Sequence, residues 1–265
     1  MKRRQLVRYA GATFLATFGL GLTSHWQAFQ AQTSDSIIVQ WLGHSAFLFT
    51  GAGQRILVNP FRPTGCTAGY RPVRVVADLV LISSRLFDEG WVDGLPGNPR
   101  LLAEAGIYEL DPLRIQGILT AHDREGGRRF GNNVIWRWNQ AGINIVHMGG
   151  AAAPITVEEQ ILIGRPDVLL LPVGGGPKAY NAQEAVSVIQ ALNPKLAIPT
   201  QYQTAAAEGV ASADCLIEPI DEFLTLAQQA LPAAQISQGT GDALTVRASA
   251  LPSTGTKVQV FKYRF

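Results

Sequence analysis

Two short aliphatic runs most constrain the fold of this 265-residue chain. Residues 78–82 and 167–173 are almost continuously apolar, without the alternation of a half-exposed strand. Unbroken apolar runs of this length are typical of strands that are buried on both faces. Such strands need a covering layer on each side. The sequence therefore predicts a layered α/β domain and not a sandwich of sheets alone.

Further strands and helices are expected around these two runs. The expected strands are 37–42, 46–50, 55–59, 115–121, 133–139, 143–148, 196–199, 244–248 and 258–263. Gln140-Ala141-Gly142 predicts a hairpin turn between two of them. Thr156 and Glu159 have the spacing of a capping box and predict a helix over 157–163. Asn181 predicts a second helix that ends at 193, and a third is expected over 219–231.

Composition and charge exclude one class of partner. Apolar residues make up 47% of the chain, which is enough to bury a sizeable core. The net charge is only +2, and much of the basic excess lies in Lys2, Arg3, Arg4 and Arg8. Nucleic-acid binding requires a clustered basic face. We therefore expect no nucleic-acid partner for the body of the chain.

Residues 1–31 have the features of an export signal. A basic start precedes an apolar stretch over 9–23, which is short for a membrane span and suits a signal peptide. The Arg-Arg-x-Leu-Val-Arg pattern resembles a twin-arginine signal, and a Sec signal is the alternative. The segment also fits an uncleaved tether, because cleavage after Ala31 or Ala28 would put Phe29 or Trp26 at the −3 position. The predicted location is the periplasm or an equivalent extracytoplasmic lumen.

Eight blocks of sequence follow one another in the order of a known family. The first four are Trp41-Leu42-Gly43-His44-Ser45-Ala46-Phe47, Arg55-Ile56-Leu57-Val58-Asn59-Pro60-Phe61, Ala77-Asp78-Leu79-Val80-Leu81-Ile82 and Ala121-His122-Asp123. The others are Gly131-Asn132-Asn133-Val134-Ile135, Ile145-Val146-His147-Met148-Gly149-Gly150, Leu171-Pro172-Val173-Gly174-Gly175-Gly176 and Ile198-Pro199-Thr200-Gln201-Tyr202. Together they resemble the metallo-β-lactamase superfamily, in particular its ascorbate-phosphate-lactonase-like Zn-dependent hydrolase branch. The resemblance implies that residues 37–265 form a four-layer αβ/βα sandwich with its metal site at the edge between two sheets.

The segment that should carry the metal ligands departs from the family. There the strand runs into Thr-His-x-His-x-Asp-His, which supplies ligands to two metal ions. In this chain Ser84, Leu86 and Glu89 stand at the three histidine positions, and only Asp88 matches. The resemblance therefore implies a conserved scaffold with a dismantled metal site.

The remaining ligand positions are also largely changed. His122 matches the family, whereas Gly150 replaces the bridging aspartate and Gln201 replaces the final histidine. A catalytic zinc ion normally has at least three protein ligands, so we expect no metal and no cofactor. The remnant site is Asp88 and His122, with His44, Glu89 and Gln201 nearby. One alternative remains, a site for calcium or magnesium formed by Asp88, Glu89 and the Gln201 amide oxygen, and the weak metal candidates are Asp88, Glu89 and His122.

Two histidines have competing interpretations. His44 lies in a tight Gly-His-Ser turn, where it would either stabilise the turn by a hydrogen bond or bind a ligand anion. His147 ends a buried strand and is expected to be a core histidine whose hydrogen bonds are satisfied. Gly174-Gly175-Gly176 is expected to be a tight strand-to-helix turn, because the Lys-Ser/Thr of a phosphate-binding loop is missing.

Cys66 and Cys215 are the only two cysteines. Export would bring them into an oxidising compartment, and the resemblance puts both of their loops on the same rim of the sandwich. They are therefore candidates for a disulfide, and two separate buried thiols are the alternative.

These observations lead to one functional hypothesis and two alternatives. We expect an exported, non-catalytic binding or assembly protein that holds a small molecule or a protein partner at the former active-site cleft. The first alternative is a metal-dependent hydrolase of an ester, lactone or phosphoester, with zinc or another divalent ion in a site rebuilt from Asp88, Glu89, His122 and His44. The second is a membrane-tethered assembly factor.

Overall fold

The computed structural model describes residues 35–211, 213, 215–231 and 235–265. The predicted export signal, over residues 1–31, lies outside this range. Within the described ranges, no helix combines the length and the apolar character that crossing a membrane requires.

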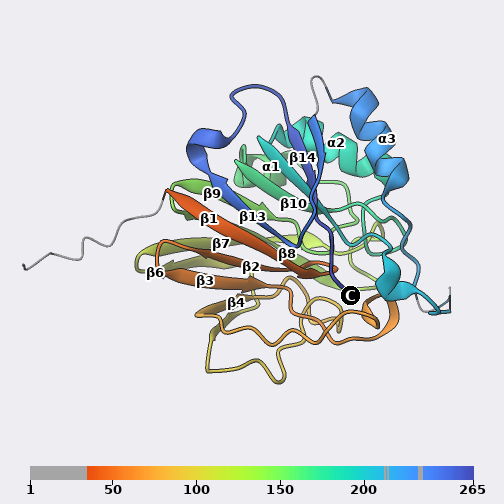
Figure 1. Cartoon of the computed structure of the whole chain (residues 1–265), viewed down its shortest axis with the longest axis horizontal. Helices are drawn as coiled ribbons and strands as arrows, with labels where there is room; N and C mark the ends of the chain where they lie inside the picture. The colour runs from red at the N-terminus through yellow and green to blue at the C-terminus, as the bar shows by residue number, and fades with distance from the viewer. Residues whose placement is uncertain (1–34, 212, 214, 232–234) are drawn as a thin grey trace, which may run out of the picture. The chain divides into compact units, whose positions relative to one another are not determined.

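Two β-sheets form the centre of the domain (Figure 1). The six-stranded sheet has, in spatial order, β13 (Ala243–Arg247), β1 (Ser36–Gly43), β2 (Ala46–Gly51), β3 (Gln54–Val58), β4 (Leu79–Leu81) and β5 (Arg100–Leu102). The eight-stranded sheet has β12 (Gln235–Gln238), β14 (Lys257–Val260), β11 (Leu196–Thr200), β10 (Val168–Pro172), β9 (Ile143–His147), β8 (Asn132–Gln140), β7 (Leu113–Ala121) and β6 (Gly106–Leu110). This mixed arrangement of two sheets with helices confirms the predicted α/β fold class.

Three α-helices accompany the eight-stranded sheet. They are α1 (Val157–Ile163), α2 (Ala182–Leu192) and α3 (Asp221–Ala230). Helix α1 contacts β7, α3 contacts β12, and α2 contacts both other helices. The predicted capping box at α1 is confirmed, since Thr156 Oγ1 accepts from the Glu159 amide and Glu159 Oε2 accepts from the Thr156 amide. Asn181 caps α2 through the same reciprocal contacts with Glu184.

The two aliphatic runs form β4 and β10, and every residue of both strands is buried. The predicted hairpin joins β8 and β9, with Ala141 and Gly142 both at positive φ. Trp138 on β8 lies edge-on to Phe49 on β2, with ring centroids 5.0 Å apart, so it packs one sheet against the other. Strands β5, β6 and β12 are absent from our prediction. All three carry partly exposed residues, which weaken the apolar signal.

Strand direction brings distant loops to one rim of the domain. Strands β9, β10 and β11 are mutually parallel, and β7 has the same direction because β8 is antiparallel to both β7 and β9. The segments that follow these four strands begin at His122, Met148, Val173 and Gln201. His122, Gly150 and Gln201 lie in such segments, whereas Asp88 and Glu89 follow β4 and His44 lies between β1 and β2. Both sheets therefore contribute to the candidate site.

A disulfide closes this rim. Cys66 lies in the short 3₁₀ helix η1 (Gly65–Thr67), and its sulfur is bonded to that of Cys215, at a sequence separation of 149 and with 4.8 Å between their Cα atoms. Of the two alternatives that the sequence left open, the structure has the bonded one.

We expect the double substitution Cys66→Ala/Cys215→Ala to destabilise the domain. A cross-link over so long a loop restricts the unfolded chain, and its loss typically costs about 2–5 kcal/mol. Thermal melts of the oxidised protein, the double variant and the wild type in dithiothreitol measure the effect. The variant and the reduced protein should melt together, below the oxidised protein. Coincidence of all three melts would show that the bond contributes no stability.

Candidate functional site

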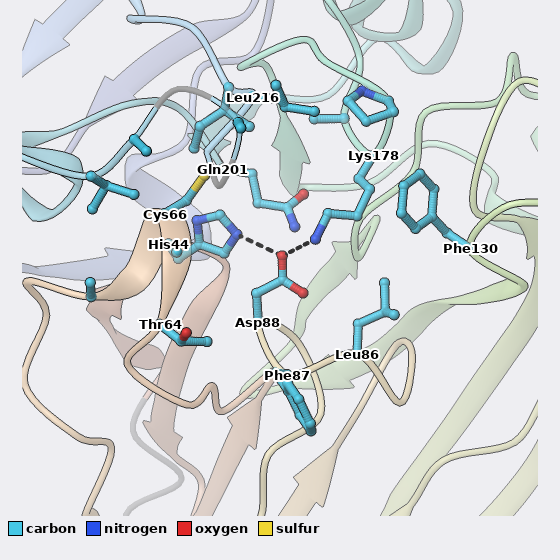
Figure 2. A pocket seen from close by; sticks show the side chains of 18 of the residues that line it. His44, Thr64, Cys66, Leu86, Phe87, Asp88, Phe130, Lys178, Gln201 and Leu216 are labelled. Atoms are coloured by element: carbon cyan, nitrogen blue, oxygen red, sulfur yellow. Dashed lines mark hydrogen bonds and ion pairs between the residues drawn. The ribbon is translucent and has the colours of Figure 1, made fainter.

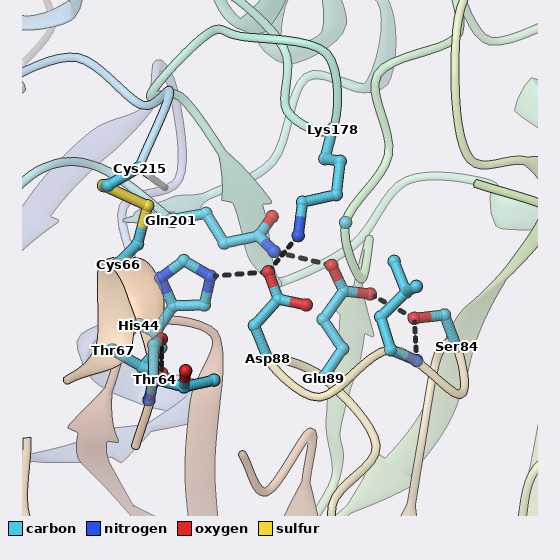
Figure 3. A network of polar contacts seen from close by, with 12 residues as sticks. His44, Thr64, Cys66, Thr67, Ser84, Asp88, Glu89, Lys178, Gln201 and Cys215 are labelled. Atoms are coloured by element: carbon cyan, nitrogen blue, oxygen red, sulfur yellow. Dashed lines mark hydrogen bonds and ion pairs between the residues drawn. A yellow bond between two sulfur atoms is a disulfide. The ribbon is translucent and has the colours of Figure 1, made fainter. Parts of the chain in front are cut away.

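A buried carboxylate, that of Glu89, lies at the centre of the candidate site (Figure 3). Its Oε2 accepts a hydrogen bond from Ser84 Oγ at 2.9 Å, and its Oε1 accepts one from Gln201 Nε2 at 2.7 Å. His122 Nε2 lies 3.2 Å from both carboxylate oxygens. Thus three segments that follow β4, β7 and β11 all point a polar group at the same carboxylate.

The electrostatics of this cluster favour a buried ion pair. Burial by itself would raise the pKa of Glu89, but the charge and hydrogen bond of His122, with Lys178 and Gln201, lower it overall. Burial likewise opposes a charge on His122, yet the Glu89 carboxylate raises its pKa overall. Each partner thus favours the charged form of the other.

A second ion pair lies beside the first. Lys178 Nζ donates a hydrogen bond to Asp88 Oδ2, and His44 Nε2 lies 3.8 Å from the same oxygen (Figure 3). Burial lowers the pKa of His44 to about 4, despite the attraction of Asp88, so its imidazole is neutral at neutral pH. Neither of its ring nitrogens has a hydrogen-bond partner among the described residues.

Several expectations about these residues are corrected. Asp88 and Glu89 lie in a turn and not side by side around a cation, since Asp88 pairs with Lys178 and Glu89 with His122. Gln201 presents its amide nitrogen, and not its oxygen, to the cluster. The His44 ring makes no turn-stabilising hydrogen bond, and it is the backbone carbonyl of His44 that accepts one, from Trp41 Nε1.

The residues present do not fit a two-zinc centre. Ser84 and Gln201 point hydrogen-bond donors at Glu89, whereas a metal ion requires lone pairs. A Cβ atom at Gly150, the position that the resemblance aligns with a bridging aspartate, would lie 2.0 Å from Glu89 Oε1. The carboxylate therefore fills the space that the bridging ligand would need. In the parts of the chain that the structure describes, no three histidine, cysteine, aspartate or glutamate side chains are grouped so that they could hold a metal ion.

His147 is a core histidine with both ring nitrogens satisfied, as the sequence predicts. Its Nε2 donates to the Ser45 carbonyl at 3.0 Å, and its Nδ1 accepts from the Gly149 amide at 3.1 Å. Burial lowers its pKa to about 4, against the opposing influence of the Ser45 carbonyl and Glu89. These contacts fix one neutral tautomer and hold the turn that leads to Gly150.

We expect the neutral state of His147 to make the domain acid-sensitive. Between the unfolded pKa of about 6.5 and the folded value, the unfolded chain binds one more proton, so stability falls as the pH falls. The contribution reaches about 3 kcal/mol by pH 4. Urea titrations of the wild type and His147→Gln from pH 7.5 to 4 test this. The wild type should lose more stability than the variant over that interval, and parallel pH profiles would contradict the expectation.

A cavity of about 950 Å³ opens beside the second ion pair (Figure 2). Its polar lining includes His44, Asp88, Lys178 and Gln201. The walls are mainly apolar and include Leu86, Phe87, Phe130, Val210, Leu216 and Ile217. Leu86, which the resemblance aligns with a histidine ligand, is part of an apolar wall.

Sequence reasoning missed Lys178. It follows Gly174-Gly175-Gly176-Pro177 in the loop between β10 and α2, in which the Gly175 amide donates to the Tyr180 carbonyl. This loop spans 173–181 and is longer than the tight turn that the sequence predicts. No spacing rule links Lys178 to Asp88, which lies 90 residues earlier. One signal was available: Lys178 is a cation that closely follows a buried strand, and that strand ends at the same rim as the loops with the other site residues.

Comparison with known proteins identifies the family. The model of the beta-lactamase superfamily domain matches residues 38–201, which is more than half of the chain. The chain belongs to the metallo-β-lactamase superfamily. A UPF0173 metal-dependent hydrolase of Thermococcus onnurineus is 28% identical over 195 residues, which cover 63% of this chain and 84% of the relative. A second relative so named, Ta0764 of Thermoplasma acidophilum, is 23% identical over 64% of this chain and 85% of its own length.

A solved structure supports the same assignment. A Thermotoga maritima protein, named as a Zn-dependent hydrolase of the metallo-β-lactamase superfamily, aligns with a TM-score of 0.66 and 26% identity. The alignment covers 86% of this chain and all of that protein. The superfamily member described here thus has the fold of a protein named as a Zn-dependent hydrolase.

Proposed function

We propose that this superfamily member is an exported, non-catalytic binding protein that needs no metal ion or other cofactor. In this proposal it holds a small molecule, or a segment of a protein partner, in the cavity beside Asp88 and Lys178, and nucleic acid is not a partner. The observation that carries the proposal is the position of the Glu89 carboxylate. It occupies the space where a bridging ligand would lie and receives donors from Ser84, Gln201 and His122.

Charge compensation supports the proposal. A carboxylate that binds zinc gains its stabilisation from the ion, and without the ion it needs another cation nearby. Here Lys178 pairs with Asp88 and His122 pairs with Glu89. Each remaining acidic side chain of the former site thus has an internal cation. The cavity beside these pairs provides the room for a ligand.

Elemental analysis of the natively exported protein tests the proposal. We expect far less than one equivalent of any transition metal per chain, and identical thermal melts with and without a strong chelator, because a bound ion would add stability that a chelator removes. One or two equivalents of metal, or a melt lowered by chelator, would overturn it.

A rebuilt hydrolase is the second candidate, and the names of the relatives favour it. Its site would use Asp88, Glu89, His122 and His44 with zinc or another divalent ion, and its substrate would be an ester, lactone or phosphoester. Metal-dependent turnover of such a substrate that chelator abolishes would establish this candidate. Absence of turnover with added zinc, calcium or magnesium would leave the binding protein.

The export part of the proposal rests on residues 1–31. If the signal is of the twin-arginine type, replacing both Arg3 and Arg4 by lysine should retain the charge but abolish export, because that pathway reads the arginine pair. Cell fractionation compares this variant with Lys2→Arg, which leaves the pair intact. Unchanged export of the double variant would point to a Sec signal. Recovery of the wild type in the membrane fraction with residues 1–31 attached would favour a tethered assembly factor.

A further inference from the structure

The floor of the cavity has polar atoms without partners. Both ring nitrogens of His44 and the Oε1 atom of Gln201 are buried and have no hydrogen-bond partner among the described residues. His44 is 3% exposed and Gln201 is 2% exposed. Both line the cavity, where they lie close to Asp88 and Lys178 (Figure 2). Buried polar groups without partners are costly, so these atoms mark a place where a ligand would complete the hydrogen bonding.

The unpartnered atoms require both donors and acceptors from a ligand. Gln201 Oε1 only accepts, so the ligand must donate to it. A neutral imidazole has one donor and one acceptor, so His44 can bond to a ligand group of either kind. A primary carboxamide provides a carbonyl oxygen and two N–H groups on one carbon atom. It therefore matches the floor better than a group that only donates or only accepts.

The charges near the floor are already paired. Asp88 is held by Lys178, and Glu89 is held by His122. A charged ligand head would lose its hydration without meeting an unpaired countercharge there, and that desolvation is expensive. Arg129 also lines the cavity, but its side chain is solvent-exposed and lies over the Phe130 ring, 4.9 Å from the ring centroid. It therefore belongs to the rim and not to the floor.

The walls favour a flat apolar body. Phe87, Phe130, Leu86 and Leu216 surround the floor, and the cavity volume of about 950 Å³ exceeds that of a single-ring compound. Aromatic walls interact favourably with the faces and edges of ligand rings.

Resting on the proposed function, we propose that the cavity binds an uncharged, ring-bearing small molecule whose head is a carboxamide or a closely similar donor–acceptor group. The head contacts His44 and Gln201, and the ring lies against the apolar walls. The ligand class is thus set by two buried side chains whose hydrogen bonding the protein leaves incomplete.

Three probes that differ in head charge test this ligand class. Indole-3-acetamide is neutral, indole-3-acetate is an anion and tryptamine is a cation, while all three carry the same ring. Protein-observed NMR titrations of the natively exported protein measure their affinities. We expect the amide to bind at least about 10-fold more tightly than either charged probe, since a lost or uncompensated polar contact is worth roughly 1.4 kcal/mol or more. Equal or tighter binding of either charged probe would overturn the proposal.

Matched histidine variants locate the contact. His44→Phe removes the two ring nitrogens and should weaken amide binding about 10-fold or more, whereas His147→Phe changes a histidine outside the cavity lining and should not. Because His44 has a φ of 51°, which phenylalanine tolerates poorly, the melt of each variant is measured as well. Leu216→Trp is the second test, since it fills the cavity from a half-exposed position and should abolish amide binding. Unchanged binding in folded His44→Phe or Leu216→Trp would overturn the proposal.

The outcomes distinguish a wrong ligand class from a wrong proposed function. Metal in the native protein would remove the binding-protein hypothesis, whatever the probes do. A metal-free protein that prefers indole-3-acetate or tryptamine would retain that hypothesis and reject the uncharged ligand.

Discussion

Replacing Glu89 by alanine is expected to lower the free energy of unfolding by about 3–5 kcal/mol, because the partners of this fully buried carboxylate lose their counter-charge. The carboxylate has contacts with Ser84, Gln201 and His122, and its exposed fraction is 0%. Its removal leaves buried donors unsatisfied and an imidazolium without its counter-ion. Urea-induced unfolding at pH 7 provides the measurement.

Two further variants identify the cause of this loss. Glu104→Ala removes a carboxylate of the same type from an exposed pair with Arg85 and should leave stability unchanged within error, because exposed ion pairs contribute little. Glu89→Ala/His122→Ala should cost clearly less than the sum of the two single substitutions, since the partners interact directly. Additive effects, or a Glu89→Ala variant as stable as Glu104→Ala, would contradict the assignment of a stabilising ion pair.

Restoring the family's ligands should give this chain a zinc site. The change consists of Ser84→His, Leu86→His, Glu89→His, Gly150→Asp and Gln201→His, with Asp88 and His122 retained. Loops held by the surrounding strands pre-position the new side chains, so little ordering cost opposes tight binding. Gly150 does not have a positive φ. A side chain there meets the Glu89 carboxylate, which the same change removes, and His122 Nε2, which lies 2.7 Å from the Cβ position and must shift. Elemental analysis and calorimetric zinc titration measure the result.

Lys178 decides whether one ion binds or two. Its ammonium group holds Asp88, which the second ion would need, so the fivefold variant should bind one zinc ion and addition of Lys178→Ala should admit a second. The matched control omits Glu89→His. The retained carboxylate then lies 2.0 Å from the Cβ position at Gly150, and we expect this fourfold variant to bind less zinc or to fold poorly. A folded sixfold variant that binds no zinc would show that these loops do not have the family geometry.

Local sequence determined most of the framework. The buried runs became β4 and β10, the Ala141-Gly142 turn closed a hairpin, and the capping residues started α1 and α2. Each of these features depends on residues a few positions apart, where backbone preference and alternation act directly. The departure from the family's ligand motif remains a prediction, because it depends on how the resemblance aligns these loops.

Only the tertiary structure decided which partners Asp88 and Glu89 have. Asp88 and Glu89 are adjacent in the sequence, yet Asp88 contacts Lys178, whereas Glu89 contacts His122 and Gln201. These partners lie between 33 and 112 residues away in the chain, and no local preference selects them. Burial of the carboxylates selects these partners. A carboxylate removed from water needs a cation or donors within hydrogen-bonding distance, and which groups lie that close depends on where the folded strands end.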